Sequence, residues 1–497
     1  ALVGTGAWRA GITMWTNAQL NSGTGKIYLE GDSTANNATW NPGIELNLNN
    51  SCVSTSNRFA ITSANNDTVN PAITMIGRAG SSAASNGIVN YCGSSTATDV
   101  TIQSLGTGGI SMTGSTQASG EYGIDLNGVN VLARSGKIKL DGGLYGIATG
   151  QSIGVSAGRT TFGSCLNDCG TQDYGYDAAT PSSSDVELYA DRFSWSANNS
   201  LNRINTSGNV KILPSNQSTR KWTDTVDFYV TLPTVVTTFT AGYDLGSATN
   251  AQYFRNRSSI TSNGAIKLFA DTLDIYGDLR TKNLGAKILL KASYYIYFNG
   301  RTITTNKGPI IVWADSDQQT APGGFIGLDT NTSFNSADGA TMPTTTSAVQ
   351  AAVGGGDITL GGGPASVSDS ELPAGFAFSF GNNPPIQVVN GSQIFSGGGN
   401  ISLRGQNKAD VANHWVSAVR IEQNTKINSG AGKIFIEGDS TAATAYSYGS
   451  GVALNYGGTT KSMITSAGGS ATQSAIRIVG RGGTNENGID SYYAYSK

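Results

Sequence analysis

Residues 25–31 read Gly-Lys-Ile-Tyr-Leu-Glu-Gly, and the same order of a glycine, one intervening residue and two alternating apolar residues recurs along the chain. Further copies begin at Gly136, Gly264, Gly356 and Gly399. An alternation with a period of two places the apolar side chains on one face of a strand and the intervening side chains on the other. The pattern therefore predicts short, half-buried β-strands that follow glycine-rich turns.

The alternation also predicts which side chains of these motifs lie inside. The residues expected in the core are Ile27, Leu29, Ile138, Leu140, Ile401, Leu403, Ile434 and Ile436. The residues expected on the surface are Lys26, Tyr28, Glu30 and Lys139. A register slip of one residue would exchange the two sets, so this prediction is easily contradicted.

Composition and motif spacing favour a solenoid over a globular domain. The chain has 497 residues, of which 66 are glycine and only 13% are charged, although 38% are hydrophobic. One globular core seldom reaches this length, whereas stacked repeats can. Gly264, Gly285 and Gly308 stand 21 and 23 residues apart, which predicts an all-β parallel β-helix of roughly 20-residue coils, an elongated rod. An antiparallel sandwich joined by hairpins is the competing interpretation.

The distribution of charge argues against two classes of partner. The net charge is −2, with 31 basic and 33 acidic residues, and like charges do not cluster into long runs. Nucleic acids and anionic membranes both require a basic surface, so neither is expected as a partner. The most apolar stretch, residues 286–298, is interrupted by Lys287 and Lys291, so membrane insertion is not expected either.

The two ends of the chain repeat each other. Residues 8–34 align without a gap on residues 415–441, with 13 identities in 27 positions and an offset of 407. We therefore expect one unit at 1–407, with an irregular excursion around 219–260, and the start of a second unit at 408–497. Such a chain looks like a window on a longer tandem array. Its expected partners are further copies of itself, in the same chain or end to end in a filament.

Three strings carry a resemblance to a known family: SGAGKIFIEGDST at 429–441, ITTNKGPIIVWADSD at 303–317 and SGGGNISLRGQN at 396–407. They resemble the repeats of filamentous-haemagglutinin-type adhesins, the large bacterial surface proteins of two-partner secretion. The resemblance implies a right-handed parallel β-helix, an extracellular location at the cell surface and a role in attachment. The amino-terminal secretion domain of that family is not recognisable in this chain.

We therefore expect a non-enzymatic structural fibre or adhesin stalk. Two alternatives share the β-helix. A carbohydrate-active lyase or hydrolase would need clustered carboxylates with lysine or arginine on one face. A glycan-binding β-helix without turnover would use exposed aromatic residues such as Tyr492, Tyr493 and Tyr495, and cell-surface glycans would then be its partners.

Four cysteines permit two disulfides in a chain of extracellular character. The second copy of the repeat lacks counterparts of both Cys52 and Cys92, which favours a bond between them. Cys165 and Cys169 would then close a tight loop. A separation of 40 residues is nearly two standard coils, so the first bond requires an intervening bulge. Free buried thiols are the alternative.

Two sets of residues are candidates for a catalytic centre. His414 is the only histidine, which rules out a multi-histidine metal centre and leaves little for Ser/His/Asp catalysis. Glu30 with Asp32, and Glu437 with Asp439, have a spacing that could place two carboxylates on one strand face, as a glycosidase requires. We expect these pairs instead to lie in solvated turns beside the adjacent glycines, and we expect no catalytic residues.

Two kinds of modification or ligand remain as candidates. Asp315 and Asp317 could ligate calcium with backbone carbonyl groups, although no cofactor or metal is otherwise expected. Asn-x-Ser/Thr sequences, which are acceptors for N-glycosylation, occur at Asn37, Asn66, Asn205, Asn256 and Asn400. They arise easily by chance in a chain rich in Asn, Ser and Thr.

Overall fold

The computed structural model is almost entirely β-structure, and the only helix among the described residues is a single 3₁₀ turn, η1 (Gly143–Tyr145). The structure describes residues 10–15, 17–35, 39–48, 59–83, 85–90, 100–149, 160–164, 182–195, 202–215, 222, 225–245, 253–317, 323–342, 354–379, 383–408, 416–441, 449–457, 460–483 and 487–491. Over these ranges no helix has the length and apolar character needed to cross a membrane.

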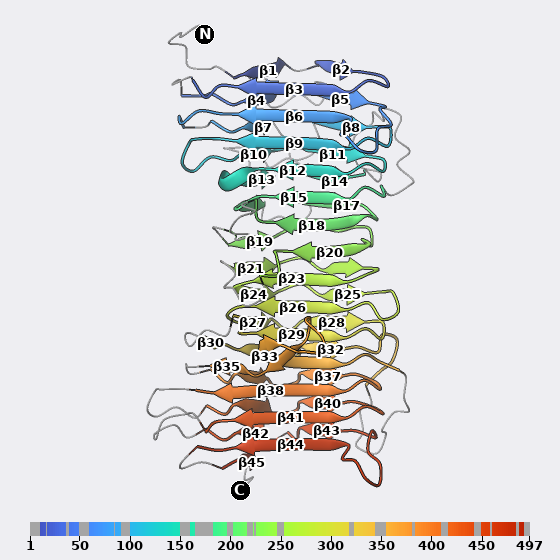
Figure 1. Cartoon of the computed structure of the whole chain (residues 1–497), viewed down its shortest axis with the longest axis vertical. Helices are drawn as coiled ribbons and strands as arrows, with labels where there is room; N and C mark the ends of the chain where they lie inside the picture. The colour runs from blue at the N-terminus through green and yellow to red at the C-terminus, as the bar shows by residue number, and fades with distance from the viewer. Residues whose placement is uncertain are drawn as a thin grey trace. The chain divides into compact units, whose positions relative to one another are not determined.

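The chain divides into two compact units, Ala1–Tyr243 and Asp244–Lys497. In each unit the strands follow one another in threes, and equivalent strands of successive coils stack into three sheets (Figure 1). We call these the first, second and third sheets, in the order in which the chain visits them. Each unit is described separately.

In unit 1 the described strands are as follows. The first sheet contains β1 (Ile12–Trp15), β4 (Ile44–Leu48), β7 (Ile88–Asn90), β10 (Ile124–Leu126), β13 (Ile147–Thr149) and β16 (Phe193–Trp195). The second contains β2 (Gln19–Asn21), β5 (Phe59–Ser63), β8 (Val100–Ser104), β11 (Val129–Ala133), β14 (Thr160–Gly163) and β17 (Asn202–Asn205). The third contains β3 (Ile27–Asp32), β6 (Ile73–Arg78), β9 (Ile110–Ser115), β12 (Ile138–Asp141), β15 (Val186–Tyr189), β18 (Asn209–Leu213) and β20 (Thr238–Ala241). Strand β19 (Val226–Phe228) lies near β16.

In unit 2 the first sheet contains β21 (Tyr253–Asn256), β24 (Thr272–Ile275), β27 (Ile296–Phe298), β31 (Ile326–Leu328), β36 (Ile386–Val388), β39 (Val419–Glu422), β42 (Val452–Tyr456) and β45 (Ile489–Ser491). The second contains β22 (Ile260–Ser262), β25 (Leu279–Thr281), β28 (Thr302–Thr305), β32 (Ser333–Asn335), β37 (Gln393–Phe395), β40 (Lys426–Asn428) and β43 (Met463–Thr465). The third contains β23 (Ile266–Ala270), β26 (Ile288–Ala292), β29 (Ile310–Ala314), β33 (Ile358–Ala365), β38 (Ile401–Asn407), β41 (Ile434–Asp439) and β44 (Ile476–Arg481), with the short strands β30 (Gly323–Gly324), β34 (Pro373–Gly375) and β35 (Ala377–Ser379) beside it.

Strand pairing is parallel along each stack and keeps its register except for shifts in β1–β4 and β39–β42, which confirms the prediction of an all-β parallel β-helix. Ile138 of β12, for example, pairs with Ile110 on one side and with Val186 on the other. Among the described strands, antiparallel pairing occurs only between β33 and β34 and between β30 and β35, which belong to local excursions. The hairpin-joined sandwich is therefore excluded as the general arrangement. The handedness of the helix stays a prediction.

The predicted coil length is wrong for most of the chain. Ile266, Ile288 and Ile310 pair in succession, so these two coils advance by 22 residues each. The step from Ile27 to its partner Ile73 is 46 residues, however. Only the strands must stay in register between coils, because the connections run over the surface and can lengthen at little cost in free energy.

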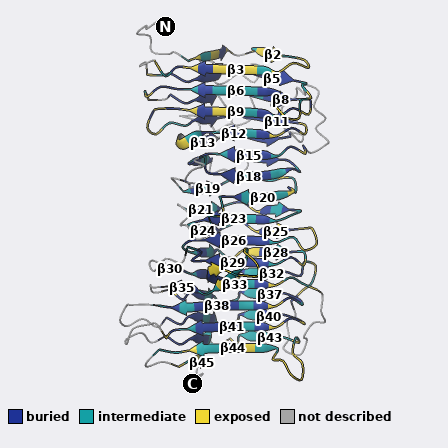
Figure 2. Ribbon diagram, in the orientation of Figure 1, coloured by how far each residue is buried: buried dark blue, intermediate teal, exposed yellow. Residues whose placement is uncertain are grey.

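The structure places the predicted core residues on the inner face. Six of them are at most 1% exposed: Ile138, Leu140, Ile401, Leu403, Ile434 and Ile436. Ile27 and Leu29 point inward but are only half-buried, which corrects their assignment to the core. The reason is that β3 pairs with β6 alone, so no described strand covers the other edge of its coil. Lys26, Tyr28 and Glu30 are exposed and Lys139 is half-buried. Figure 2 shows the exposed positions along β3 in yellow.

The glycines that close the motifs at 25–31 and 432–438 lie inside strands and not in turns, which corrects the interpretation of Gly31 and Gly438. Gly31 is within β3, and a Cβ atom on it would lie 2.1 Å from the carbonyl oxygen of Gly43. At Gly438 the corresponding distance to the oxygen of Gly451 is 1.8 Å. The chain bends back so tightly after the third sheet that only glycine fits at this inward-facing position.

Strands of the two aligned sequence segments occupy equivalent places in the two units. β1, β2 and β3 correspond by sequence to β39, β40 and β41, and each belongs to the same sheet of its unit as its counterpart. The compact units nevertheless meet at residues 243 and 244 and not near 407. Within the range 219–260, β19 and β20 are regular strands, and β20 pairs in register with β18. The boundary at 407 stays a prediction about the sequence repeat.

Candidate binding groove

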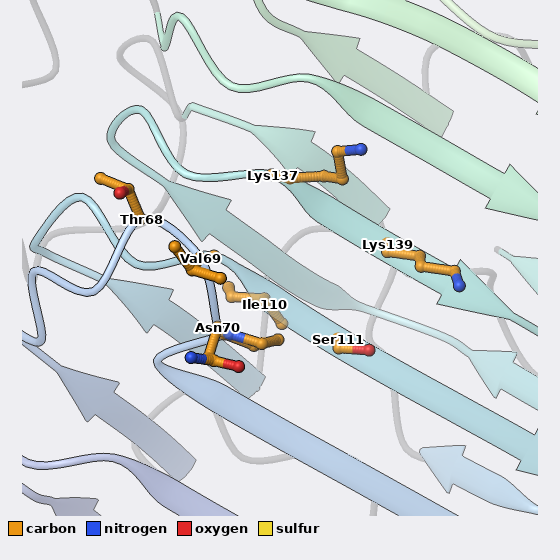
Figure 3. Close-up of a pocket in the computed structure, with 9 residues that line it drawn as sticks. Thr68, Val69, Asn70, Ile110, Ser111, Lys137 and Lys139 are labelled. Carbon is orange, nitrogen blue, oxygen red and sulfur yellow. The ribbon is translucent and has the colours of Figure 1, made fainter.

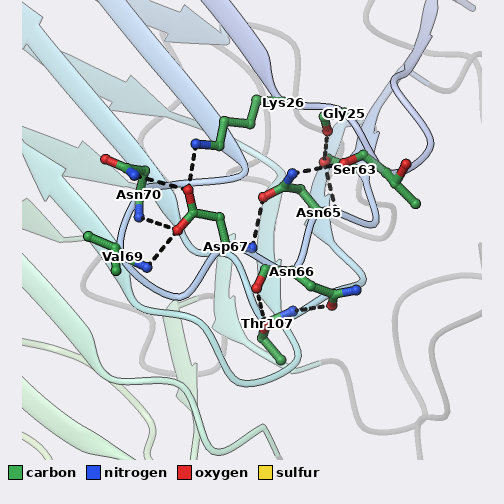
Figure 4. Close-up of polar contacts among 10 residues, drawn as sticks. Gly25, Lys26, Ser63, Asn65, Asn66, Asp67, Val69, Asn70 and Thr107 are labelled. Carbon is green, nitrogen blue, oxygen red and sulfur yellow. Dashed lines mark hydrogen bonds and ion pairs between the residues drawn. The ribbon is translucent and has the colours of Figure 1, made fainter.

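The loop at residues 65–70 of unit 1 is organised around one carboxylate. Asp67 accepts hydrogen bonds from the backbone N–H groups of Val69 and Asn70 at 2.9 and 3.1 Å, and from the Asn70 side chain at 2.9 Å (Figure 4). Its other contact is an ion pair of 2.6 Å with Lys26, on the preceding coil. The bond from Lys26 and then those from Asn70 hold the pKa of Asp67 well below its usual value, so this carboxylate is charged at neutral pH.

Side-chain amides fix the same loop to the coils on either side. Asn65 donates to the carbonyl oxygen of Thr24 at 2.8 Å, and its own side-chain oxygen accepts from the N–H of Asp67 at 3.0 Å. On the opposite side, Thr107 donates through both its N–H and its hydroxyl to Asn66. Because the loop is bonded at both edges, Thr68, Val69 and Asn70 are held in one arrangement over the third sheet.

A groove with a cavity of about 280 Å³ lies between this loop and the outer face of β9 and β12 (Figure 3). Its lining residues are Thr68, Val69, Asn70, Pro71, Gly109, Ile110, Ser111, Lys137 and Lys139. Val69 is 86% exposed, although it is apolar. The volume lies just below the range of roughly 300–1,000 Å³ that is usual for ligand pockets, so the groove suits a small group or one end of a longer ligand.

The two lysines of the groove belong to a cluster around Glu187. Lys137 and Lys211 contact one carboxylate oxygen of Glu187 at 3.0 and 3.1 Å, and Tyr189 donates to the other at 3.1 Å. Lys139 lies over the ring of Tyr189, 5.1 Å from its centre, and makes no ion pair with a described carboxylate. Two lysines therefore share the Glu187 carboxylate and Lys139 lies beside them over Tyr189, so these four charged side chains together carry a net positive charge.

The neighbouring groups shift the pKa values of both acids in this cluster. Burial alone would raise the pKa of Glu187, but the hydrogen bonds from Lys137 and Lys211 outweigh burial and lower it. Burial and then the charge of Glu187 raise the pKa of Tyr189. At neutral pH the carboxylate is thus charged and the phenol is neutral. The groove offers a cation, amide and hydroxyl donors and an apolar wall, which is a binding arrangement for an anionic group that carries a small apolar surface.

Sequence reasoning did not identify this groove. Lys139 was assigned to the surface, but nothing singled it out as a binding residue. The available signal was the string Gly136-Lys-Ile-Lys-Leu, in which both outward positions of one strand are lysine. The loop at 65–70 leads into β6, two coils before β12, so no local sequence pattern indicated that Val69 lies against β12.

The four carboxylates of the two candidate glycosidase pairs all bond to neighbouring side chains. The expected solvated position is wrong for Glu437, which is only 7% exposed, whereas Glu30 and Asp32 are exposed and Asp439 is half-buried. Glu30 pairs with Arg78 at 2.5 Å, and Asp32 accepts two hydrogen bonds from Thr34. Glu437 lies between two arginines, at 3.1 Å from Arg404 and 2.8 Å from Arg481. Asp439 accepts hydrogen bonds from Thr441 and Gln406. Each pair lies along one outward strand face, in an ion-pair column that links successive coils.

Asp315, one of the two calcium candidates, is buried and lacks hydrogen-bond donors. It is 1% exposed, and neither carboxylate oxygen has a hydrogen-bond partner in the described structure. Burial, and then repulsion from Asp317, raises the pKa of Asp315 to about 8, while Lys408 acts in the opposite direction. No group of three or more His, Cys, Asp or Glu residues gathers as a metal site within the described ranges.

The remaining sequence candidates fall into two groups. Asn205 and Asn256 are 2% and 0% exposed and donate to carbonyl oxygens, so the folded chain does not present them for glycosylation. Asn66 and Asn400 are exposed. The residues that lie outside the described ranges are Asn37, Cys52, Cys92, Cys165, Cys169, His414, Tyr492, Tyr493 and Tyr495. The disulfide pairings therefore stay predictions.

Comparison of the chain with models of protein families, with curated proteins and with solved structures gives no significant match.

Proposed function

We propose that this chain is part of a non-enzymatic structural fibre or adhesin stalk at a bacterial cell surface. The observation that carries the proposal is the in-register stacking of equivalent strands, illustrated by Ile401, Ile434 and Ile476 on β38, β41 and β44. Each coil is joined to the next by a row of backbone hydrogen bonds and by a continuous apolar stack, so a load is shared among many bonds. The extracellular location and the role in attachment rest on the family resemblance.

The ion pairs of two carboxylates support a structural role over an enzymatic one. Glu30 and Glu437 each form an ion pair with an arginine of a neighbouring coil. A general acid needs a carboxyl with a raised pKa, whereas the hydrogen bonds from Tyr28 and then from Arg78 lower that of Glu30. These residues act as links between coils.

Further copies of the chain, in the same polypeptide or end to end in a filament, are the partners that we propose. The support is the equivalence of β3 and β41, because β41 pairs in register with β38 on one edge and with β44 on the other. A strand like β38 from another copy would match β3 in the same way. Electron microscopy of the intact surface protein should show filaments with a regular axial repeat, and isolated particles without contacts between copies would contradict the proposal.

The fibre proposal is tested by comparing attachment with turnover. Beads coated with the purified chain should adhere to a target-cell or glycan surface and resist detachment under flow. The same protein, incubated with acidic and neutral polysaccharides, should release no new reducing ends or unsaturated products. Product release that scales with protein concentration would instead support the carbohydrate-active alternative, and it should then fall in a Glu30→Gln or Glu437→Gln variant.

Glycan binding without turnover is a second candidate function, and the groove beside Lys139 favours it. The loop at 65–70 is already fixed by Asp67, so a ligand would not have to order it on binding. An acidic sugar would place its carboxylate or sulfate at Lys139 and an apolar edge against Val69. Lys139→Ala should weaken binding to hyaluronan about tenfold. Lys26→Ala loosens the loop but leaves the charge at Lys139. Comparing the two variants separates the contribution of the ordered loop to binding from that of the lysine charge.

A further inference from the structure

An aromatic surface lies on the outer face of the first sheet in unit 2. Phe254, Leu273, Ile296 and Ile326 form the inner face of β21, β24, β27 and β31, and all four are 0% exposed. The alternate positions face outward and carry Tyr253, Tyr295, Tyr297 and Phe325, which are half-buried. We call these four residues the tyrosine face. Since the core is already filled from the inner side of these strands, the outer rings are not needed to form it.

The rings of the tyrosine face contact one another across the strands. Tyr295 stacks on Phe325, with ring centres 5.0 Å apart and an angle of 16° between the planes. Tyr253 meets Tyr295 edge-on at 6.3 Å. Tyr297 pairs with Gly327, and a Cβ atom on Gly327 would lie 2.7 Å from the Tyr297 ring, so the ring rests directly on the backbone of the next coil. The result is a shallow aromatic surface that continues from coil to coil.

The charges around this surface compensate one another. Arg255 forms an ion pair of 3.2 Å with Asp274, and the guanidinium of Arg257 lies 4.0 Å from the centre of the Tyr276 ring. Asp329 accepts a hydrogen bond from Tyr297; burial and then the charge of Asp329 raise the pKa of this tyrosine. Two positive and two negative groups border the surface, so its charge favours neither a polyanion nor a polycation.

We propose that the tyrosine face binds a neutral polysaccharide whose chain runs across β21, β24, β27 and β31. A sugar ring has an apolar C–H face and a hydroxyl-bearing edge, and aromatic rings with polar groups at their margin match both parts. Successive strands lie about 4.8 Å apart, so an extended chain can contact several coils at once. The proposal does not depend on the groove of unit 1 or on the fibre function.

The test is electrophoresis of the full chain through gels that contain a soluble β-glucan, galactomannan or dextran, with hyaluronan as the acidic comparison. At least one neutral polysaccharide should retard the protein, and the retardation should persist at about 1 M salt, where the Debye length is about 3 Å. Tyr295→Ala and Tyr297→Ala should each weaken binding about tenfold. Tyr297→Phe, which keeps the ring but loses the bond to Asp329, should retain most of the affinity.

Two control variants test whether binding depends on the tyrosine face. Tyr28→Ala removes an aromatic residue that is 60% exposed on a different sheet, and Lys139→Ala alters the groove; both should bind as the unmodified chain does. Titration of the unmodified chain with the retarding polysaccharide should perturb its tyrosine absorbance, which tests the surface even if an alanine variant fails to fold. The proposal is overturned if no neutral polysaccharide retards the chain, if both alanine variants bind normally, or if only hyaluronan binds and salt abolishes it.

Discussion

A Cβ atom on Gly438 would lie 1.8 Å from the carbonyl oxygen of Gly451, which directly precedes β42, the first-sheet strand of the next coil. Gly405 and Gly480 pair with Gly438 in register, and Cβ atoms on them would lie 2.2 and 1.9 Å from carbonyl oxygens of the following segment. This column of glycines lets the chain bend from the third sheet into the first sheet of the next coil without opening the core.

Gly438→Ala should therefore be strongly destabilising, by about 3 kcal/mol, because the clash is with backbone that cannot move without shifting a strand. Gly285→Ala is the matched control: it has a positive φ of 76° but no atom within 4 Å of a new Cβ, so it should cost only the backbone strain of about 1 kcal/mol. Urea unfolding monitored by circular dichroism measures both. Equal losses in the two variants would contradict the steric explanation.

Ile138→Ala should cost about 2–5 kcal/mol in free energy of unfolding, since Ile138 is 0% exposed and coils cover it on both sides. Ile27→Ala should cost less, about 1 kcal/mol, because that side chain is only half-buried. The same urea experiment checks the ranking. If Ile27→Ala proves the more damaging substitution, the edge of β3 is covered in solution by a partner.

Glu187→Gln should destabilise unit 1 by about 1–3 kcal/mol at pH 7, because Lys137 and Lys211 would lose their shared anion. The pKa of Glu187 is lowered in the folded chain, so its contribution is present above its unfolded pKa of about 4.3 and disappears as the pH falls through the folded value. The variant and the unmodified chain should converge at low pH. Glu30→Gln, on an exposed pair, should change stability much less than Glu187→Gln does.

Asp315→Asn should make the protein more stable at alkaline pH, by about 1–3 kcal/mol, since it removes a buried charge without a partner. The pKa of Asp315 is about 8 in the folded chain and about 3.9 in an unfolded one. The contribution of Asp315 to the free energy of unfolding is thus fully present below about pH 3.9 and is lost as the pH rises toward 8. Thermal unfolding at pH 5 and pH 9 checks the prediction.

Calcium provides the counter-test for the same residue. If calcium raises the melting temperature of the unmodified chain but not of Asp315→Asn, the carboxylate binds a cation and the expected gain from the substitution is wrong. If Asp315→Asn is more stable than the unmodified chain and chelation of calcium does not change this gain, the side chain of Asp315 is protonated and has no partner.

The sequence by itself determined the class of fold and the direction of the core side chains. The alternation in Gly136-Lys-Ile-Lys-Leu was enough to predict that Ile138 and Leu140 are buried. A strand has only two faces, and the apolar face packs in the core while the other faces solvent. It did not determine coil length, since the connection from β3 to β6 is free to lengthen while Ile27 and Ile73 stay paired.

Both candidate binding surfaces were decided only by the tertiary structure. Val69 and Lys139 belong to different coils, and so do Tyr295 and Phe325; stacking brings each pair together. No local sequence pattern specifies such a contact, because it depends on the number of residues in the connections between the strands of each coil. The same dependence explains why Asp315, an ordinary surface residue type, lies buried at a corner of the core.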